Sequence, residues 1–151
     1  MRIKLLTLCL FILLGFMIFA ADSSVAGKQV DMISDRINFM KMSERNILAI
    51  KQSINTSDYK RARKNALSLK KWLYKMISFS PLGSGASTSN SSAASNDIWE
   101  NFQAFERLVK SKQKGADEMM SAAKNNNKQK LIQAFDATVK SCNSCHSAFR
   151  N

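Results

Sequence analysis

The stretch Cys142-Asn143-Ser144-Cys145-His146, close to the C-terminus, has the pattern C-x-x-C-H. This pattern is typical of a c-type haem attachment site, in which two thiols bond to the haem vinyl groups and the adjacent histidine offers a nitrogen to the iron. On a helix, positions i, i+3 and i+4 share one face, so the three functional side chains would point the same way. His146 is the one histidine of the sequence.

Other uses of a cysteine pair fit this stretch less well. A zinc site needs four ligands, and two further Cys or His are missing, because the third cysteine of the sequence lies in the N-terminal apolar run. A redox C-x-x-C normally opens a helix after a strand, and no strand is indicated. A structural disulfide is the last alternative. We therefore expect one haem c, bound covalently through Cys142 and Cys145.

The N-terminus has the pattern of an export signal. Arg2 and Lys4 precede an apolar run over residues 5–19, and small residues follow it. A basic start, an apolar stretch and a small-residue cleavage site are typical of a signal peptide. The apolar run is shorter than the about 20 residues that a membrane span needs. An uncleaved anchor is the competing interpretation.

We place signal cleavage after Ala26, with Ala20 as the alternative site. Residues 1–26 are then a signal peptide, and residues 27–151 form one domain that acts in the periplasm. Export agrees with the haem hypothesis, because covalent haem attachment in bacteria takes place outside the cytoplasm.

The mature segment shows helical periodicity in four stretches, over residues of about 29–54, 58–78, 97–123 and 128–149. In the last of them, a seven-residue pattern of inward positions includes both motif cysteines: Leu131, Phe135, Thr138, Cys142, Cys145 and Phe149. Four helices joined by two tight turns and one long loop predict an all-α protein, an antiparallel four-helix bundle with covalent haem near the C-terminus.

Three local features of the sequence each allow two structural interpretations. The connection 83–96 is rich in Ser, Ala, Gly and Asn, and we expect it to be slack rather than to pass over the haem edge. Lys112 interrupts the apolar stripe of the third helix, and we expect its head to extend to water. Gly115, in the same helix, allows close approach either of a neighbouring element or of haem.

An exported four-helix chain with C-x-x-C-H at its extreme C-terminus resembles the class II cytochromes c, the group of cytochrome c-prime and its low-spin relatives. The segment Arg36-Ile37-Asn38-Phe39-Met40-Lys41 looks like the first-helix pattern of this family, in which an arginine precedes by four residues the one facing the iron. Phe79-Ser80-Pro81 before a small-residue loop resembles its second interhelical region. Cys142 to Arg150 looks like its C-terminal ending.

The resemblance implies roles for six cofactor-binding residues. By this resemblance, Cys142 and Cys145 would hold the haem, and His146 would be the proximal ligand. Met40 would stand on the distal side. Arg36 would lie near a propionate, and Arg150 would lie near the proximal histidine. The expected metal ligands are His146 and Met40.

The sixth coordination position of the iron decides between two functions. Ligation by Met40 would give an electron carrier, which is our main expectation from the sequence. An open distal side would leave five-coordinate, high-spin iron that binds small gases such as nitric oxide, and both behaviours occur in this family. Met40 could also simply fill the core. We see no acid–base pair near His146, and we therefore do not expect an enzyme.

The sequence is strongly basic, with 23 Lys and Arg against 11 Asp and Glu and a formal net charge of +12. Seven of these cations crowd the second predicted helix: Lys60, Arg61, Arg63, Lys64, Lys70, Lys71 and Lys75. A solvated helix face is the simple interpretation, and steering toward an acidic redox partner protein or transiently toward a membrane surface is the functional one. Nucleic acid does not suit an exported haem protein. The apolar stripes of the first two helices also allow a homodimer.

Overall fold

The computed structural model describes the backbone of residues 2–88 and 90–151, and the side chains of residues 27–29, 31–88 and 90–151. The side chains of the predicted signal peptide, and hence its cleavage site, lie outside the described residues. The chain divides into two units, residues 1–32 and residues 33–151. Within the described part of the chain, we find no helix with the length and apolar character of a membrane span.

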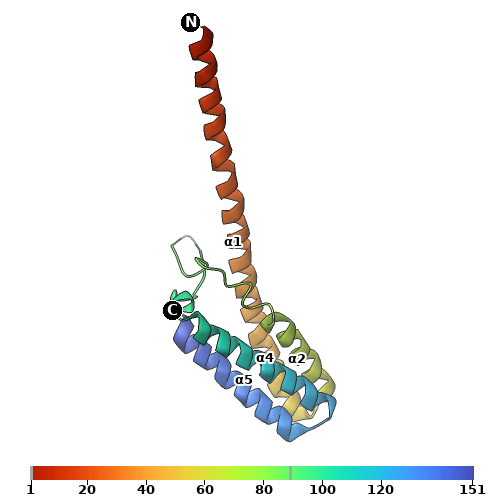
Figure 1. The fold of residues 1–151 in the computed structure, drawn as a ribbon. Helices are drawn as coiled ribbons and strands as arrows, with labels where there is room; N and C mark the ends of the chain where they lie inside the picture. The colour runs from red at the N-terminus through yellow and green to blue at the C-terminus, as the bar shows by residue number, and fades with distance from the viewer. Residues whose placement is uncertain (1, 89) are drawn as a thin grey trace. The chain divides into compact units, whose positions relative to one another are not determined.

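The regular structure of the described backbone is helical, with one isolated bridge between Ala94 and Arg150. The helices are α1 (Arg2–Thr56), α2 (Tyr59–Leu73), α3 (Asp97–Glu100), α4 (Phe102–Lys124) and α5 (Lys128–Phe149). In residues 33–151, the C-terminal part of α1 contacts α2, and α4 lies between α2 and α5 and contacts both (Figure 1). The predicted all-α, antiparallel four-helix bundle is confirmed, and α3 is a single extra turn.

Two helix boundaries differ from the prediction. The second helix ends at Leu73 rather than near residue 78, because the chain continues in turns, such as the one closed by the Lys75 amide donating to the Trp72 carbonyl at 2.8 Å. The third predicted helix is interrupted at Asn101, whose φ of −122° and ψ of 42° separate α3 from α4. Asp58 caps the N-terminus of α2, since its carboxylate accepts from the Arg61 amide at 2.9 Å.

Specific side-chain contacts join three pairs of helices. Phe39 of α1 stacks on Trp72 of α2, with ring centroids 4.6 Å apart. The side chain of Gln113 on α4 donates to the Leu73 carbonyl at the end of α2 at 3.0 Å. The Ser141 hydroxyl of α5 donates to the Leu108 carbonyl of α4 at 3.2 Å. These contacts join α1 to α2, α2 to α4 and α4 to α5.

Gly115 lets α4 approach α5 closely. A Cβ atom at this position would lie 2.1 Å from Oγ1 of Thr138, well inside van der Waals contact. The Thr138 hydroxyl itself donates to the Ala134 carbonyl at 2.7 Å, so its position is fixed. Of the two roles open to Gly115, the contact with a neighbouring helix is the one observed.

The loop between α2 and α3 is not slack, which corrects our expectation. Ser84, Ser92 and Ser95 are buried. The loop is tied to the C-terminal end of α5, because the Ser95 amide donates to the Phe149 carbonyl and the Asn151 amide to the Ala93 carbonyl, each at 2.9 Å. The small side chains predicted a lack of apolar packing, but here they allow the backbone to lie close to the bundle and hydrogen-bond with it.

Candidate functional site

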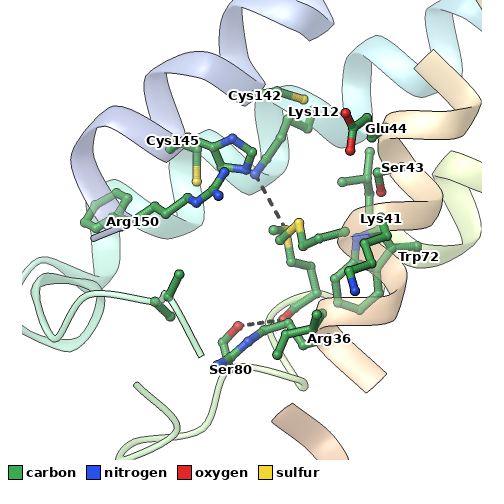
Figure 2. A pocket seen from close by; sticks show the side chains of 18 of the residues that line it. Arg36, Lys41, Ser43, Glu44, Trp72, Ser80, Lys112, Cys142, Cys145 and Arg150 are labelled. Carbon is green, nitrogen blue, oxygen red and sulfur yellow. Dashed lines mark hydrogen bonds between the residues drawn. The ribbon is translucent and has the colours of Figure 1, made fainter. Parts of the chain in front are cut away.

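A cavity of about 680 Å³ lies within the bundle, between the helices and the loop. It is lined by all six residues that the family resemblance selected: Arg36, Met40, Cys142, Cys145, His146 and Arg150. Figure 2 shows Cys142, Cys145 and Arg150 presented by the end of α5, facing a wall that includes Trp72 and the α1 residues Lys41 and Ser43. Residues more than 100 positions apart in sequence therefore share one cavity.

The two motif cysteines lie one helical turn apart on α5. Cys145 is buried at 4% exposure, Cys142 is half-buried, and they are not joined in a disulfide. Burial raises the pKa of the Cys142 thiol, partly opposed by the charge of Lys112. Redox-active cysteines need a lowered pKa, so this environment does not favour the redox alternative. Among the described residues, no group of three or more His, Cys, Asp or Glu side chains could hold a metal ion, which disfavours the zinc alternative.

His146 lies in the last turn of α5, at the exposed rim of the cavity. Its carbonyl accepts the Arg150 amide at 3.1 Å, which keeps the helix intact through the motif. Partial burial, together with the positive charges of Lys112 and Arg150, lowers the pKa of the imidazole. The neutral imidazole is thereby favoured, and this is the form that can ligate a metal.

Met40 lines the cavity from α1, half-buried and packed against the core. Leu69, Trp72 and Leu73 of α2 extend the same apolar wall. These four side chains offer hydrocarbon, aromatic and thioether groups, and the polar lining from α1 includes Lys41, Ser43 and Glu44. A thioether there could ligate a metal or only fill space, and the geometry is compatible with both.

Arg36 has a structural role that the sequence did not reveal. It is buried at 5% exposure. Its Nη1 donates to the Phe79 carbonyl at 3.0 Å and to the Ser84 hydroxyl at 2.7 Å. Its Nη2 donates to the Ser84 carbonyl and, at 2.8 Å, to the Ser92 hydroxyl. Four of its five N–H donors hold the loop, which leaves the Nε–H for the predicted contact with a propionate.

Arg150 terminates α5 and is exposed. Its backbone pairs with Ala94 of the loop in the isolated bridge. Arg150, four residues after His146, therefore joins α5 to the loop and also lines the cavity. Its charge contributes to the lowered pKa of the imidazole, in line with the predicted place near the proximal histidine.

Lys112 is a cavity residue whose placement we predicted wrongly. Instead of reaching water, it is 3% exposed and lines the cavity from α4. Its Nζ lies 3.6 Å from Sδ of Met76. It shares one face of α4 with Val109 and Ala116, and all three residues are buried.

The cavity residues fit the haem c that the motif implies. The volume falls in the range of about 300–1,000 Å³ that is usual for cofactor pockets. Both thiols and the imidazole come from one helix and line the same space. Arg36 is a buried cation without a carboxylate partner among the described side chains, which suits a cofactor that carries two propionates. Cys142 and Cys145 would hold the group, and His146 would face its iron.

The fold and the site together define a class: a helical bundle whose last helix carries a C-x-x-C-H motif, of the kind that attaches haem c, on the wall of an internal cavity. The chain belongs to the cytochrome c' family, because the family model described as Cytochrome C' matches residues 31–150. This family is the class II cytochrome c group, so the resemblance drawn from the motifs is confirmed. Among curated proteins, none is similar enough to match.

Several solved structures share the fold. Cytochrome c prime from Shewanella frigidimarina is 21% identical, covers 82% of this chain and 96% of its own, and has a TM-score of 0.73. A nitric oxide complex of a cytochrome c prime variant from Alcaligenes xylosoxidans is 19% identical, with coverages of 82% and 96% and a TM-score of 0.71. A cytochrome c' described for its ligand-controlled dimer dissociation is 14% identical, with coverages of 81% and 95% and a TM-score of 0.74. At these identities, the likeness establishes the fold.

Proposed function

We propose that this chain holds one haem covalently through Cys142 and Cys145, with His146 as the proximal ligand, and binds a small gas such as nitric oxide on the opposite side. The observation that carries the proposal is the cavity itself. The motif side chains on α5 line the same cavity as Met40, Leu69 and Leu73, whose apolar side chains offer space for a gas molecule. When bound, haem supplies an iron that changes oxidation state by one electron and can accept a small ligand.

Each set of side chains has its own part in this proposal. The thiols anchor the group, and the neutral imidazole offers one nitrogen to the metal. Met40, Leu69 and Leu73 exclude water from the distal space. Arg36 keeps the loop over the cavity in place by its hydrogen bonds to Ser84 and Ser92. The nitric oxide complex of the Alcaligenes xylosoxidans relative supports the gas-binding assignment.

An electron carrier with Met40 as the sixth ligand is the second candidate. The observation that favours it is that Met40 lines the same cavity as His146. A methionine ligand would close the distal side and stabilise ferrous iron. In both candidates the chain binds and exchanges electrons rather than catalyses a reaction.

The visible spectrum of the oxidised and reduced holoprotein separates these candidates. A high-spin spectrum with nitric oxide binding to the ferrous form is the expected result. A low-spin spectrum in both states would replace the gas-binding assignment by the carrier. Acid extraction tests the attachment, because thioether-bound haem stays with the denatured protein. Extraction of all the haem, or titration of two free thiols in the holoprotein, would overturn covalent attachment.

We further infer that residues 1–26 are a signal peptide and that residues 27–151 act in the periplasm. The family match begins at residue 31, after the proposed cleavage site, which agrees with this division. The mass of the exported protein tests it. A mature N-terminus at Gly27 is expected, Ala21 would indicate the earlier site, and an uncleaved chain would overturn the proposal.

Partners follow from charge and from the apolar helix faces. The α2 cations Lys60, Arg63 and Lys71 are exposed, so the basic face suits an acidic redox protein or a transient contact with anionic lipid. A homodimer is the other assembly that we propose, supported by the dimer reported for one structural relative. Slower electron exchange with an acidic protein at high salt would support the first partner, and a salt-independent rate would exclude it.

A further inference from the structure

Lys112 is the cavity residue that the proposed function leaves without a role. It occupies the buried face of α4, and its neighbours on that face, Val109 and Ala116, are completely buried. A lysine at such a position normally places its charge in water and buries only its carbon chain. Here the ammonium stays inside, at the cavity.

The ammonium has a weak partner for its charge. Its contact is the thioether sulfur of Met76, at 3.6 Å, and a thioether is a poor acceptor. The ion pairs among the described side chains are Lys70–Asp117, Lys110–Glu106 and Lys114–Glu118, and none includes Lys112. Glu44 also lines the cavity, but it lies beyond ion-pair distance from Lys112.

Lys112 lies where α4 meets the helix that carries the haem motif. The Ser141 hydroxyl of α5 donates to the Leu108 carbonyl of α4, one turn before Lys112. Gly115, three residues after Lys112, lies against Thr138 of α5. The ammonium therefore enters the cavity from the side of α4 that contacts α5, and the motif residues of α5 line the same cavity.

Packing alone does not explain a lysine at this position. Burying an unpaired cation costs several kcal/mol, and a neutral side chain of similar volume would avoid that cost. Methionine has a comparable length and would fill the same space between α4 and Met76. The charge itself is therefore the property to explain.

We propose that Lys112 sets the reduction potential of the haem iron by placing a positive charge inside the cavity that Cys142, Cys145 and His146 line. Ferric iron carries one more positive charge than ferrous iron, so a nearby cation disfavours the ferric state. The effect is strong inside the protein, where the dielectric constant is low. The couple exchanges one electron with an electrode mediator, and no bond forms or breaks. The inference rests on the proposed haem site.

The test is the midpoint potential of the holoprotein, measured by spectroelectrochemistry. Lys112→Met removes the charge and keeps the volume, and we expect the ferrous-to-ferric ratio at a fixed potential to fall about tenfold, which is about 59 mV for one electron. Lys112→Arg keeps the charge and should stay near the wild-type potential. Lys114→Met is the matched control, because Lys114 lies on the same helix with its side chain 78% exposed, and it should leave the potential unchanged.

A wild-type potential in Lys112→Met, or the same shift in Lys114→Met, overturns the proposal. Thermal unfolding of Lys112→Met should occur at the wild-type temperature or above, because a buried charge has been removed. If Lys112→Met does not retain haem, Lys112→Gln supplies the neutral variant. Failure of both neutral variants to retain haem, with success of Lys112→Arg, would assign Lys112 to haem attachment and overturn the proposal. A wild-type protein without covalent haem refutes the proposed function, which is a separate result.

Discussion

The guanidinium of Arg36 on α1 donates hydrogen bonds to both the hydroxyl and the carbonyl of Ser84, 48 residues later in the chain. This pair joins the first helix of the bundle to the loop that borders the cavity. The loop is in turn bonded to the end of α5 through Ser95 and Phe149. The element that carries the haem motif and the element that carries Met40 are thus connected through one loop.

Removing the Arg36 donors should release the loop. We expect Arg36→Gln to lower the free energy of unfolding by about 2 to 4 kcal/mol, because hydrogen bonds from a charged donor contribute about 1.5 to 3 kcal/mol each and are not additive. Amide hydrogen exchange should show faster exchange at Ala86 and Ser95, whose amides donate to Ala94 and Phe149. Arg45→Gln, at an exposed position of the same helix, is the control. Unchanged exchange at Ser95 would contradict the assignment.

Gly115→Ala should destabilise the bundle although alanine favours helices. The propensity gain is about 1 kcal/mol, and the overlap of the new Cβ with Thr138 costs about 1 to 3 kcal/mol. Urea unfolding should therefore show that the variant has a lower free energy of unfolding than the wild type. In the double variant Gly115→Ala with Thr138→Ala, the hydroxyl at 2.1 Å is gone, and we expect the loss to be smaller than the sum of the two single losses. Additive losses would show that α4 and α5 separate freely.

Met40→Leu distinguishes a wall residue from a ligand. Such a swap keeps the volume and costs less than about 1.5 kcal/mol, so the fold should persist. If Met40 only lines the cavity, the spectrum stays high-spin and nitric oxide still binds the ferrous protein. Conversion of a low-spin wild type to a high-spin variant would identify Met40 as the sixth ligand. Met42→Leu, at a half-buried position of the same helix, controls for loss of a thioether.

The stability that Asp117 contributes to the fold should be lost in acid. Its carboxylate lies 2.6 Å from Lys70 Nζ and accepts from the Tyr74 hydroxyl at 2.7 Å. Burial alone would raise the pKa of this carboxyl, but the hydrogen bonds from Lys70 and Tyr74 outweigh it and hold the pKa below its usual value of 3.8. A pKa that is lower in the folded state gives stability above the unfolded value, which is lost as the pH falls through the folded one.

We therefore expect Asp117→Asn to be less stable than the wild type near neutral pH, and the difference to shrink as the pH falls below about 3.8. Urea unfolding at several pH values measures it. Asp136→Asn, at an exposed position of α5, controls for the removal of one negative charge. A difference that persists unchanged in acid would show that the Asp117 contacts act through packing rather than ionisation.

The sequence alone determined the features that depend on neighbours along the chain. The spacing of Cys142, Cys145 and His146 places three groups on one helix face whatever surrounds them. The periodicity predicted four helices, and with the short turns it predicted the bundle, which the structure confirms. The family motifs in the sequence selected six site residues, and all six line one cavity. Their roles toward haem stay predictions.

Only the tertiary structure decided the features that depend on distant partners. Nothing in residues 83–96 indicates that Arg36 will bind them, and the register of Lys112 does not reveal whether a long side chain reaches water or stays inside. Gly115 needed Thr138 on the facing helix before its role could be assigned. Local spacing fixes which face a side chain occupies, whereas burial, pairing and charge environment follow from helix packing, which brings together residues that the chain keeps far apart.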